Sequence, residues 1–421
     1  MPLLFLIAMP HTSALSEAQI LAGYLIFLAS YLVFAIGKFP GYKIDRPGAA
    51  IIGAVLIFAF RILRAGDSVR YLNFATLVLL FSMMLIVGNL RLAGFFDRVA
   101  GFAVGRMGER HLLPAVIFTS GVLSAFFVND IICLVMVPFV LTVTRRMGVP
   151  PLRYLLAVAT ASNIGSVATI TGNPQNMLIG SFSGISYRSF IAHLGPVAVL
   201  GLLLDWLVLH FLGRDLAARE APNGVATEAE AAPARSLGKP VLVTAGVLIG
   251  FLAGAPPALV AAVGAALLLI TRSLEPRLVY EEVDWGLLVF FIGLFLIVGG
   301  AEQVGLTALL LEAARTWNLH SPGLLTVVTA AFSNIVSNVP AVMLLKSLAP
   351  GFADPRHAWL ILAMASTFAG NLTITGSIAN IIVVERARPQ VHIGLWEYFR
   401  VGLPITVTTL LAGWAWLSWI R

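Results

Sequence analysis

Polar residues that break helices interrupt an apolar stretch at about 152–184. The candidate substrate-binding residues in this stretch are Asn163, Thr169, Thr171, Gly172 and Asn173. Asn173 precedes Pro174, and this pair favours an N-cap followed by a first helical turn, so a short helix should start here. The free N–H groups and the positive dipole end of that helix can then bind oxygen atoms of a solute.

A second stretch, at about 358–384, has the same pattern. Its candidate binding residues are Thr373, Thr375, Gly376 and Ser377, and Ser377 occupies the cap position that matches Asn173. Asparagine amides donate hydrogen bonds to oxyanions or hydroxyls, whereas threonine hydroxyls and freed carbonyls can coordinate a cation. Each half of the chain is therefore expected to contain one broken helix.

Two other apolar stretches carry polar residues at their centres. The stretch at about 112–144 has Asn129 and Asp130 in its middle, and the one at about 321–346 has Asn334 and Asn338. Split at Asn129, each arm of about 15 residues reaches about 22 Å, which is short of a bilayer core of roughly 30 Å. We therefore expect two re-entrant helical hairpins.

Unwound backbone is costly in lipid unless it lines a cavity, so these four polar segments should meet around one hydrated site near the bilayer midplane. Small polar residues also hold transmembrane helices together by close packing, and this alternative is the better reading for an isolated serine or threonine. The paired clusters with glycine, proline and asparagine favour binding.

Acidic residues inside apolar segments are costly and therefore informative. The three clear cases, Asp130, Asp205 and Glu302, are candidate proton carriers because a carboxyl group in an apolar environment can take up and release a proton. Each also has a structural alternative: Asp130 can cap a helix, Asp205 can pair with a cation, and Glu302 can mark the end of a span. Asp130 is preferred because it adjoins Asn129.

The composition supports a membrane protein without a catalytic domain. Of 421 residues, 59% are hydrophobic and 11% charged, against roughly 45–50% and about 25% in soluble domains. The net charge of +7 comes from Lys and Arg between apolar stretches, which does not indicate nucleic acid. The chain has one cysteine and no histidine pair at metal-ligand spacing, so no metal or cofactor is expected. No nucleophile and base set and no nucleotide-binding P-loop is found, so we do not expect an enzyme.

The two halves resemble each other. The segment Ala161 to Asn176 matches Ala365 to Asn380 at an offset of 204, with Thr-Ile-Thr-Gly identical, and Asn129 matches Asn338 at 209. Residues 1–213 and 240–421 form the two transmembrane halves, and the charged 214–239 segment is a hydrophilic linker. Arginines at the base of the first hairpin outnumber acids more than at the second, which favours opposite membrane orientations. The expected fold is an all-α polytopic membrane protein with two inverted repeats.

Four segments together resemble the ion transporter superfamily. They are VNDIICLVMVPFVL, ATASNIGSVATITGNPQNMLIG, SNIVSNVPAVMLL and GNLTITGSIANIIVVE. The superfamily includes arsenite permeases, divalent anion:sodium symporters, citrate transporters and sodium:proton antiporters. The resemblance implies an inverted-repeat helical fold, alternating access, often by an elevator motion, and commonly a homodimer.

The hairpin tips resemble those of arsenite permeases more than those of dicarboxylate symporters, which have Ser-Asn-Thr at both tips. Here the tips read Val128-Asn129-Asp130 and Ser337-Asn338-Val339. Arsenite is largely uncharged near pH 7, so a neighbouring carboxylate does not repel it, whereas a dicarboxylate beside Asp130 is repelled. We therefore expect an inner-membrane transporter that exports arsenite or antimonite in exchange for protons. The alternatives are sodium-coupled transport of dicarboxylate, citrate or another oxyanion, and the membrane subunit of a pump with a separate ATPase.

Overall fold

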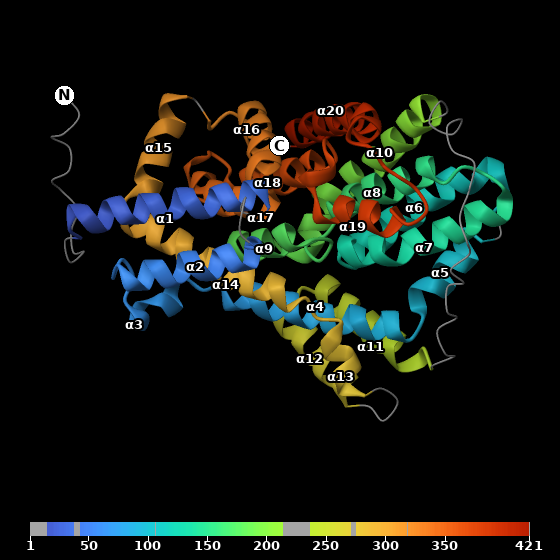
Figure 1. Cartoon of the computed structure of the whole chain (residues 1–421), viewed down its shortest axis with the longest axis horizontal. Coiled ribbons are helices and arrows are strands. Elements are labelled where there is room, and N and C mark those ends of the chain that lie inside the picture. The colour runs from blue at the N-terminus through green and yellow to red at the C-terminus, as the bar shows by residue number, and fades with distance from the viewer. Residues whose placement is uncertain are drawn as a thin grey trace. The chain divides into compact units, whose positions relative to one another are not determined.

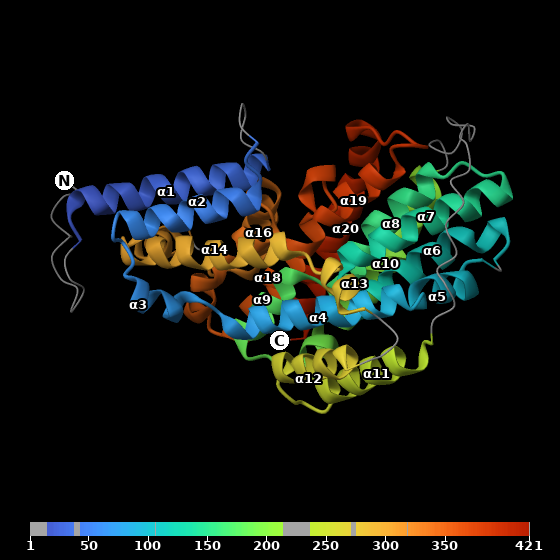
Figure 2. The ribbon, with the colours of Figure 1, turned by 60° about the horizontal axis from the view of Figure 1, so that its bottom comes forward.

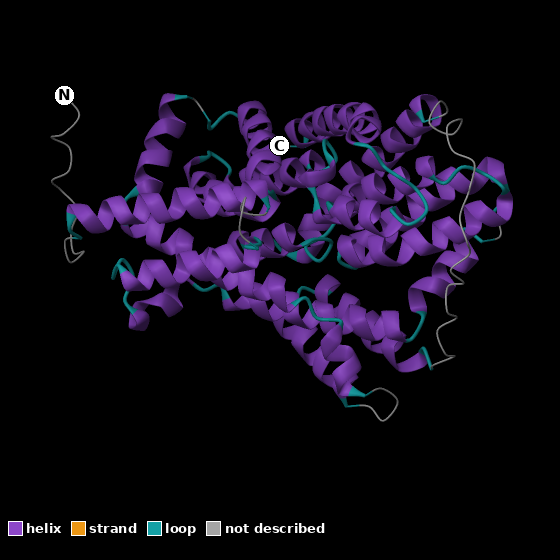
Figure 3. Cartoon of the chain, viewed as in Figure 1, coloured by secondary structure: helices purple, strands orange, loops and turns teal. Residues whose placement is uncertain are grey.

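The computed structural model describes residues 15–37, 43–105, 107–213, 236–270, 275–317 and 319–420. No β-strand occurs in these ranges, and Figure 3 shows helices joined by loops. The helices that are long and apolar enough to cross a membrane are α1 (Glu17–Ile36), α4 (Phe74–Leu92), α10 (Tyr187–Leu212), α14 (Trp285–Gln303) and α20 (Leu395–Trp419). The prediction of an all-α polytopic membrane protein is confirmed.

The chain divides into two compact units, which we describe separately. The first comprises Met1–Asn73 and Val289–Ala313, and the second Phe74–Leu288 and Ala314–Arg421. The first unit contains α1, most of α14 and the shorter helices α2 (Arg46–Ala59), α3 (Ala65–Ser68) and η1 (Val69–Tyr71). Most of α15 (Leu306–Thr316) also belongs to it.

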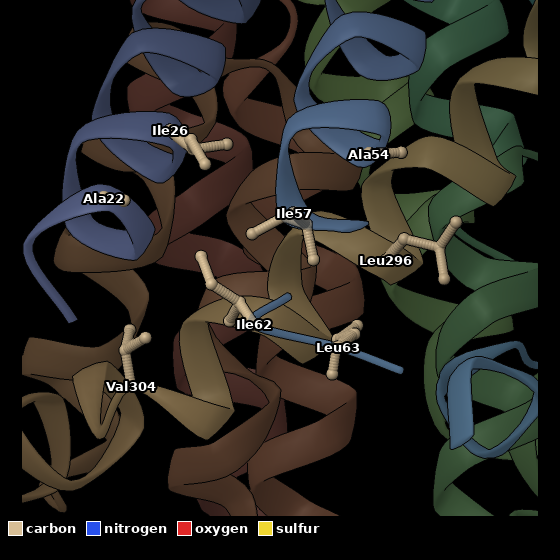
Figure 4. Packing of buried hydrophobic residues seen from close by; sticks show 8 residues of the cluster. All are labelled: Ala22, Ile26, Ala54, Ile57, Ile62, Leu63, Leu296 and Val304. Atoms are coloured by element: carbon tan, nitrogen blue, oxygen red, sulfur yellow. The ribbon is translucent and has the colours of Figure 1, made fainter. Parts of the chain in front are cut away.

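The first unit has its own apolar core, in which α1, α2 and α14 pack together (Figure 4). The core residues shown there are Ala22, Ile26, Ala54, Ile57, Ile62, Leu63, Leu296 and Val304. The helices approach closely at glycines: a Cβ on Gly300 would lie 2.4 Å from the side chain of Ile57. Small residues are typical of such helix contacts in membranes.

In the second unit, α6 (Glu109–Phe126) and α7 (Asn129–Met147) form the first helical pair, joined at Phe127 and Val128. The pair extends three residues beyond the expected 112–144 at each end, because Glu109 starts α6 and two arginines belong to the last turn of α7. Next come α8 (Leu152–Ser166) and α9 (Pro174–Ser183), separated by an unwound segment. Figure 1 shows α6, α7 and α8 side by side, and α10 packs against α6 and α8.

The C-terminal part of this unit follows the same order. The helices are α16 (Pro322–Val336), α17 (Asn338–Leu345), η2 (Lys346–Gly351), α18 (Pro355–Ala369), η3 (Ile374–Gly376), α19 (Ile378–Ala387) and α20. Here α16 and α17 form the second pair, and an unwound segment with a single 3-10 turn separates α18 from α19. Because α19 packs on α7 and α8, the two broken helices lie against each other.

The remaining helices of the second unit surround α4. They are α5 (Phe95–Ala103), α11 (Gly238–Leu252), α12 (Pro257–Leu269) and α13 (Pro276–Glu281). Figure 2 shows α11 and α12 beside α4, and an ion pair of 2.7 Å between Arg91 and Glu282 links the end of α4 to the end of α13. Most of the proposed linker, residues 214–235, lies outside the described residues. Its last two residues, Gly238 and Lys239, belong to α11 because the helical pattern of that span starts before its apolar core.

Candidate substrate-binding site

Asn163 is the centre of a buried hydrogen-bond network in the second unit. Its side-chain oxygen accepts hydrogen bonds from the amide of Asn129 (3.0 Å) and the hydroxyl of Ser377 (2.9 Å). Its amide nitrogen donates to the side-chain oxygens of Asn371 and Asn380, both at 2.9 Å. All five side chains are buried. The predicted residues Asn129, Asn163 and Ser377 are thus brought together from α7, α8 and the start of α19.

A second bond joins the broken helices at equivalent positions. The offset of 204 pairs Asn163 with Thr367 and Asn173 with Ser377. The Ser377 hydroxyl of the second segment donates to Asn163 of the first broken helix. In the same way, the Asn173 amide of the first segment donates to the Thr367 hydroxyl of the second broken helix at 3.2 Å. The two unwound segments therefore bond to each other reciprocally.

The first unwound segment is held by two asparagines. The side-chain oxygen of Asn173 accepts from the backbone N–H of Asn176 at 2.8 Å, which confirms the predicted N-cap of α9. The amide of Asn176 donates to the carbonyls of Ser166 and Thr169, both at 3.0 Å. These bonds satisfy carbonyls that lack the regular helical partner four residues further along the chain.

The second unwound segment is held in the same way. The amide of Asn380 donates to the carbonyls of Gly370 (2.7 Å) and Thr373 (3.0 Å), which are the counterparts of Ser166 and Thr169. Ser377 is the N-cap residue of α19, but its side chain makes no capping bond because its hydroxyl bonds to Asn163 instead.

Thr169, Thr171 and Gly172 bond to the junction of the first helical pair. The Thr169 hydroxyl donates to the carbonyl of Ala125, and the Thr171 hydroxyl lies 3.3 Å from the carbonyl of Phe126. The Thr171 hydroxyl is also 2.8 Å from that of Tyr187, and the Gly172 carbonyl accepts from the N–H of Asn129 at 3.0 Å. Both threonines are buried and anchor this segment.

Thr373 and Thr375 have fewer bonds. Their hydroxyls lie 3.4 Å apart; Thr373 is half-buried and Thr375 exposed. Gly376 lies beside Asn334, since a Cβ on Gly376 would be 3.0 Å from the side-chain oxygen of Asn334. The amide of Asn334 donates to the carbonyl of Ala369 at 2.9 Å and so attaches the second helical pair to α18.

Asn338 starts α17 directly after a strained residue. Ser337 has a φ of 78° and a ψ of 158°, a backbone conformation that residues other than glycine rarely adopt. Asn338 is buried, and its side-chain oxygen has no hydrogen-bond partner. Strain at a helix junction beside an unsatisfied amide is a feature of ligand sites.

The three candidate proton carriers lie in different places. Asp130 is in the first turn of α7, next to Asn129. Asp205 is fully buried in the middle of α10. Glu302 is near the end of α14 and belongs to the first compact unit, whereas all the candidate binding residues belong to the second.

The network presents amide and hydroxyl groups and lacks cationic side chains. Among the described residues, no lysine or arginine is buried. Three buried amide oxygens in the two helical pairs have no hydrogen-bond partner, and these are the Oδ1 atoms of Asn129, Asn334 and Asn338. The described ranges also contain no cluster of three or more His, Cys, Asp or Glu that could hold a metal. Free acceptor oxygens can receive a hydroxyl proton or coordinate a cation, but they cannot bind a carboxylate.

Sequence reasoning did not include several members of this network as site residues. They are Thr367, Asn371, Gln175, Asn176, Asn380 and Tyr187. The offset of 204 could have indicated Thr367 and Asn380, since these are the counterparts of Asn163 and Asn176. No sequence signal marked Asn371, whose partner Asn163 is distant along the chain, or Tyr187, which lies outside the repeated segment Ala161 to Asn176.

Comparisons with known proteins give the class of this protein. The rice silicon efflux transporter LSI3 is 28% identical over 94% of this chain and 97% of its own length. A transporter named arsB in Dictyostelium discoideum is 24% identical over 92% of this chain and 89% of its own. The crystal structure of the YdaH transporter of Alcanivorax borkumensis has the same fold, with a TM-score of 0.61 and 17% identity over 96% of this chain and 97% of that one.

These similarities and the apolar helices define an integral membrane transporter rather than an enzyme. Residues 31–369 match the CitMHS family model, described as citrate transporter. The chain belongs to this family, within the ion transporter superfamily.

Proposed function

We propose that this protein exports arsenite or antimonite across the bacterial inner membrane in exchange for protons, by alternating access. The network around Asn163 binds the solute, and two inverted repeats supply its two sides. The observation that carries the proposal is the set of unpartnered amide oxygens on Asn129 of the network and on Asn334 and Asn338 of the second helical pair, with no lysine or arginine buried among the described residues.

Protonated arsenite has three hydroxyl groups that can donate to these oxygens. It carries no charge, so it needs no cationic partner. Citrate and dicarboxylates are acceptors near neutral pH, and their burial without a cation is costly. The arsB name of the Dictyostelium relative agrees with this choice.

Silicic acid export is a second candidate, favoured by the similarity to the rice silicon efflux transporter over 94% of this chain. Silicic acid is also a small uncharged solute with several hydroxyls, so the same acceptor oxygens suit it. Sodium-coupled transport of citrate or a dicarboxylate is the main alternative, because a sodium ion can also bind free amide oxygens and then attract a carboxylate. The other alternative is passive conduction of the solute through this protein as the membrane subunit of a pump with a separate ATPase.

The test is uptake into proteoliposomes that contain only the purified protein, with an acidic interior and arsenite outside. We expect accumulation that requires the pH gradient and disappears with a protonophore. Silicic acid, succinate and citrate are run in parallel, with and without a sodium gradient. Sodium-dependent uptake of citrate or succinate without arsenite transport contradicts the proposal, and arsenite that only equilibrates contradicts the coupling. In cells, Asp130→Asn at normal protein level is expected to reduce arsenite resistance.

A further inference from the structure

Asp205 is a fully buried acid in the second compact unit that the binding network does not use. It lies in the middle of α10, and neither of its carboxylate oxygens has a hydrogen-bond partner. A buried carboxylate without a partner is strongly unfavourable, whereas a protonated carboxyl group is not. The site therefore suits the uncharged form.

The neighbouring groups also fit a protonated Asp205. The Thr160 hydroxyl on α8 faces it, but that hydroxyl donates its only proton to the carbonyl of Leu156 at 2.9 Å. Thr160 can then only accept from Asp205. With its proton directed at the Leu156 carbonyl, the Thr160 hydroxyl does not satisfy an ionised Asp205, and both carboxyl oxygens are left without a partner.

Among the described residues, no lysine or arginine is buried together with Asp205. Of the described titratable groups, Tyr398 on α20 interacts electrostatically with Asp205 and also with Cys133 on α7. The side of α10 that meets α6 and α18 is apolar, with Leu202 against Gly121 and Gly201 near Phe368. On α11, Phe251 lies against Tyr187 at the start of α10. The guanidinium of Arg153 bonds to the carbonyl of Leu209 at 3.0 Å, one turn further along α10.

Thr160 lies between Asp205 and the network around Asn163. The amide of Asn371 lies 3.4 Å from the carbonyl of Thr160, and Asn371 in turn bonds to Asn163. A rearrangement around Asn163 on solute binding can thus change the environment of Asp205. Asp130, by contrast, lies in the first turn of α7 next to Asn129, whose amide bonds directly to Asn163.

We infer that Asp205 is the proton-carrying group of the transport cycle: it is protonated in this conformation and releases its proton when the network rearranges. This inference rests on the proposed function and adds a residue to it. Asp130 then contributes to the solute site rather than to proton coupling.

The experiment compares two transport modes in proteoliposomes for the wild type, Asp205→Asn and Asp130→Asn. With one proton exchanged per arsenite, each pH unit drives about tenfold accumulation in the wild type. We expect Asp205→Asn, which mimics the protonated acid, to exchange arsenite across the membrane but to lose accumulation in a pH gradient. The control Asp130→Asn is expected to change both modes in parallel. Wild-type accumulation by Asp205→Asn overturns the inference.

Infrared spectroscopy tests the inference without arsenite. A protonated buried carboxyl group has a C=O stretch that should disappear in Asp205→Asn and shift in Asp205→Glu. The Asp205→Glu variant provides the same test if Asp205→Asn does not fold. An unchanged band in both variants, or its absence from the wild type, overturns the inference. If the wild type does not accumulate arsenite but the band assigns the proton to Asp205, the proposed substrate has failed and the proton site has not.

Discussion

The two unwound segments share the sequence Thr-Ile-Thr-Gly but differ in their surroundings. In the first, Thr169 and Thr171 are buried and bonded to the carbonyls of Ala125 and Phe126. In the second, Thr375 is exposed and bonds only to Thr373 among the contacts described. The same residues therefore fix the backbone in one half and make no bond to the helical pair in the other among the contacts described.

The helix contacts beside these segments differ as well. A Cβ on Gly165 would lie 2.0 Å from the carbonyl oxygen of Gly121, so α6 and α8 touch backbone to backbone. The counterparts of these glycines are Ala369 and Ala330, and Asn334 donates to the carbonyls of both, at 2.9 and 3.1 Å. Close packing makes the first contact rigid, whereas a hydrogen-bonded bridge can be exchanged for a bond to a solute.

The largest expected effect distinguishes the two glycines that follow Thr-Ile-Thr. A Cβ on Gly172 would lie 2.2 Å from the carbonyl oxygen of Ser166, whereas on Gly376 the nearest atom is 2.8 Å away. Gly172→Ala should lower the free energy of unfolding by about 3 kcal/mol or more, and Gly376→Ala by less. Thermal unfolding of the detergent-purified variants measures this, with Gly246→Ala, where the Cβ meets nothing within 4 Å, as the control. Equal losses for both glycines contradict the comparison.

A second prediction compares Asn163 with its counterpart Thr367. Asn163→Ala removes bonds to four buried side chains and should cost about 2–3 kcal/mol, because their polar groups lose a partner. Thr367→Ala removes two bonds, from Asn173 and Gln175, and should cost about 1 kcal/mol. Chemical denaturation of both variants and arsenite exchange by the purified protein check this order. A larger effect for Thr367 would mean that the network is not centred on Asn163.

The two threonine positions should separate stability from transport. Thr171→Val leaves the Tyr187 hydroxyl without its 2.8 Å partner and should cost about 1 kcal/mol of stability. Thr375→Val should leave stability unchanged, because this exposed hydroxyl has only a 3.4 Å contact with Thr373, and under the proposed function it should raise the KM for arsenite. Melting temperature and uptake kinetics are measured on the same preparations. Destabilisation by Thr375→Val with an unaltered KM would contradict this expectation.

The smallest expected effect concerns the junctions of the helical pairs. Ser337 has a φ of 78°, whereas Val128 at the first junction has a φ of −46°. Ser337→Gly should raise the free energy of unfolding by about 1 kcal/mol by relieving backbone strain, and Val128→Gly should lower it. Thermal unfolding checks the sign. Destabilisation by Ser337→Gly would show that its side chain, and not the strain, dominates at this junction.

The sequence by itself determined the helical spans, both breaks and the cap at Asn173. These features depend on local chemistry: long apolar runs form helices, Asn-Pro starts one, and glycine and threonine clusters interrupt them. The predicted helix pairs near 112–144 and 321–346 correspond to α6–α7 and α16–α17 within a few residues at their ends.

Only the tertiary structure decided which polar residues act together. Asn163 meets Asn371, Asn380 and Ser377 across more than 200 positions of the chain, and these contacts depend on how α8 packs against α19. Burial likewise separates Thr171 from Thr375, although both occupy the same place in identical tetrapeptides. Residue type sets what a side chain can bond to, but the neighbours supplied by packing determine which of those bonds it makes.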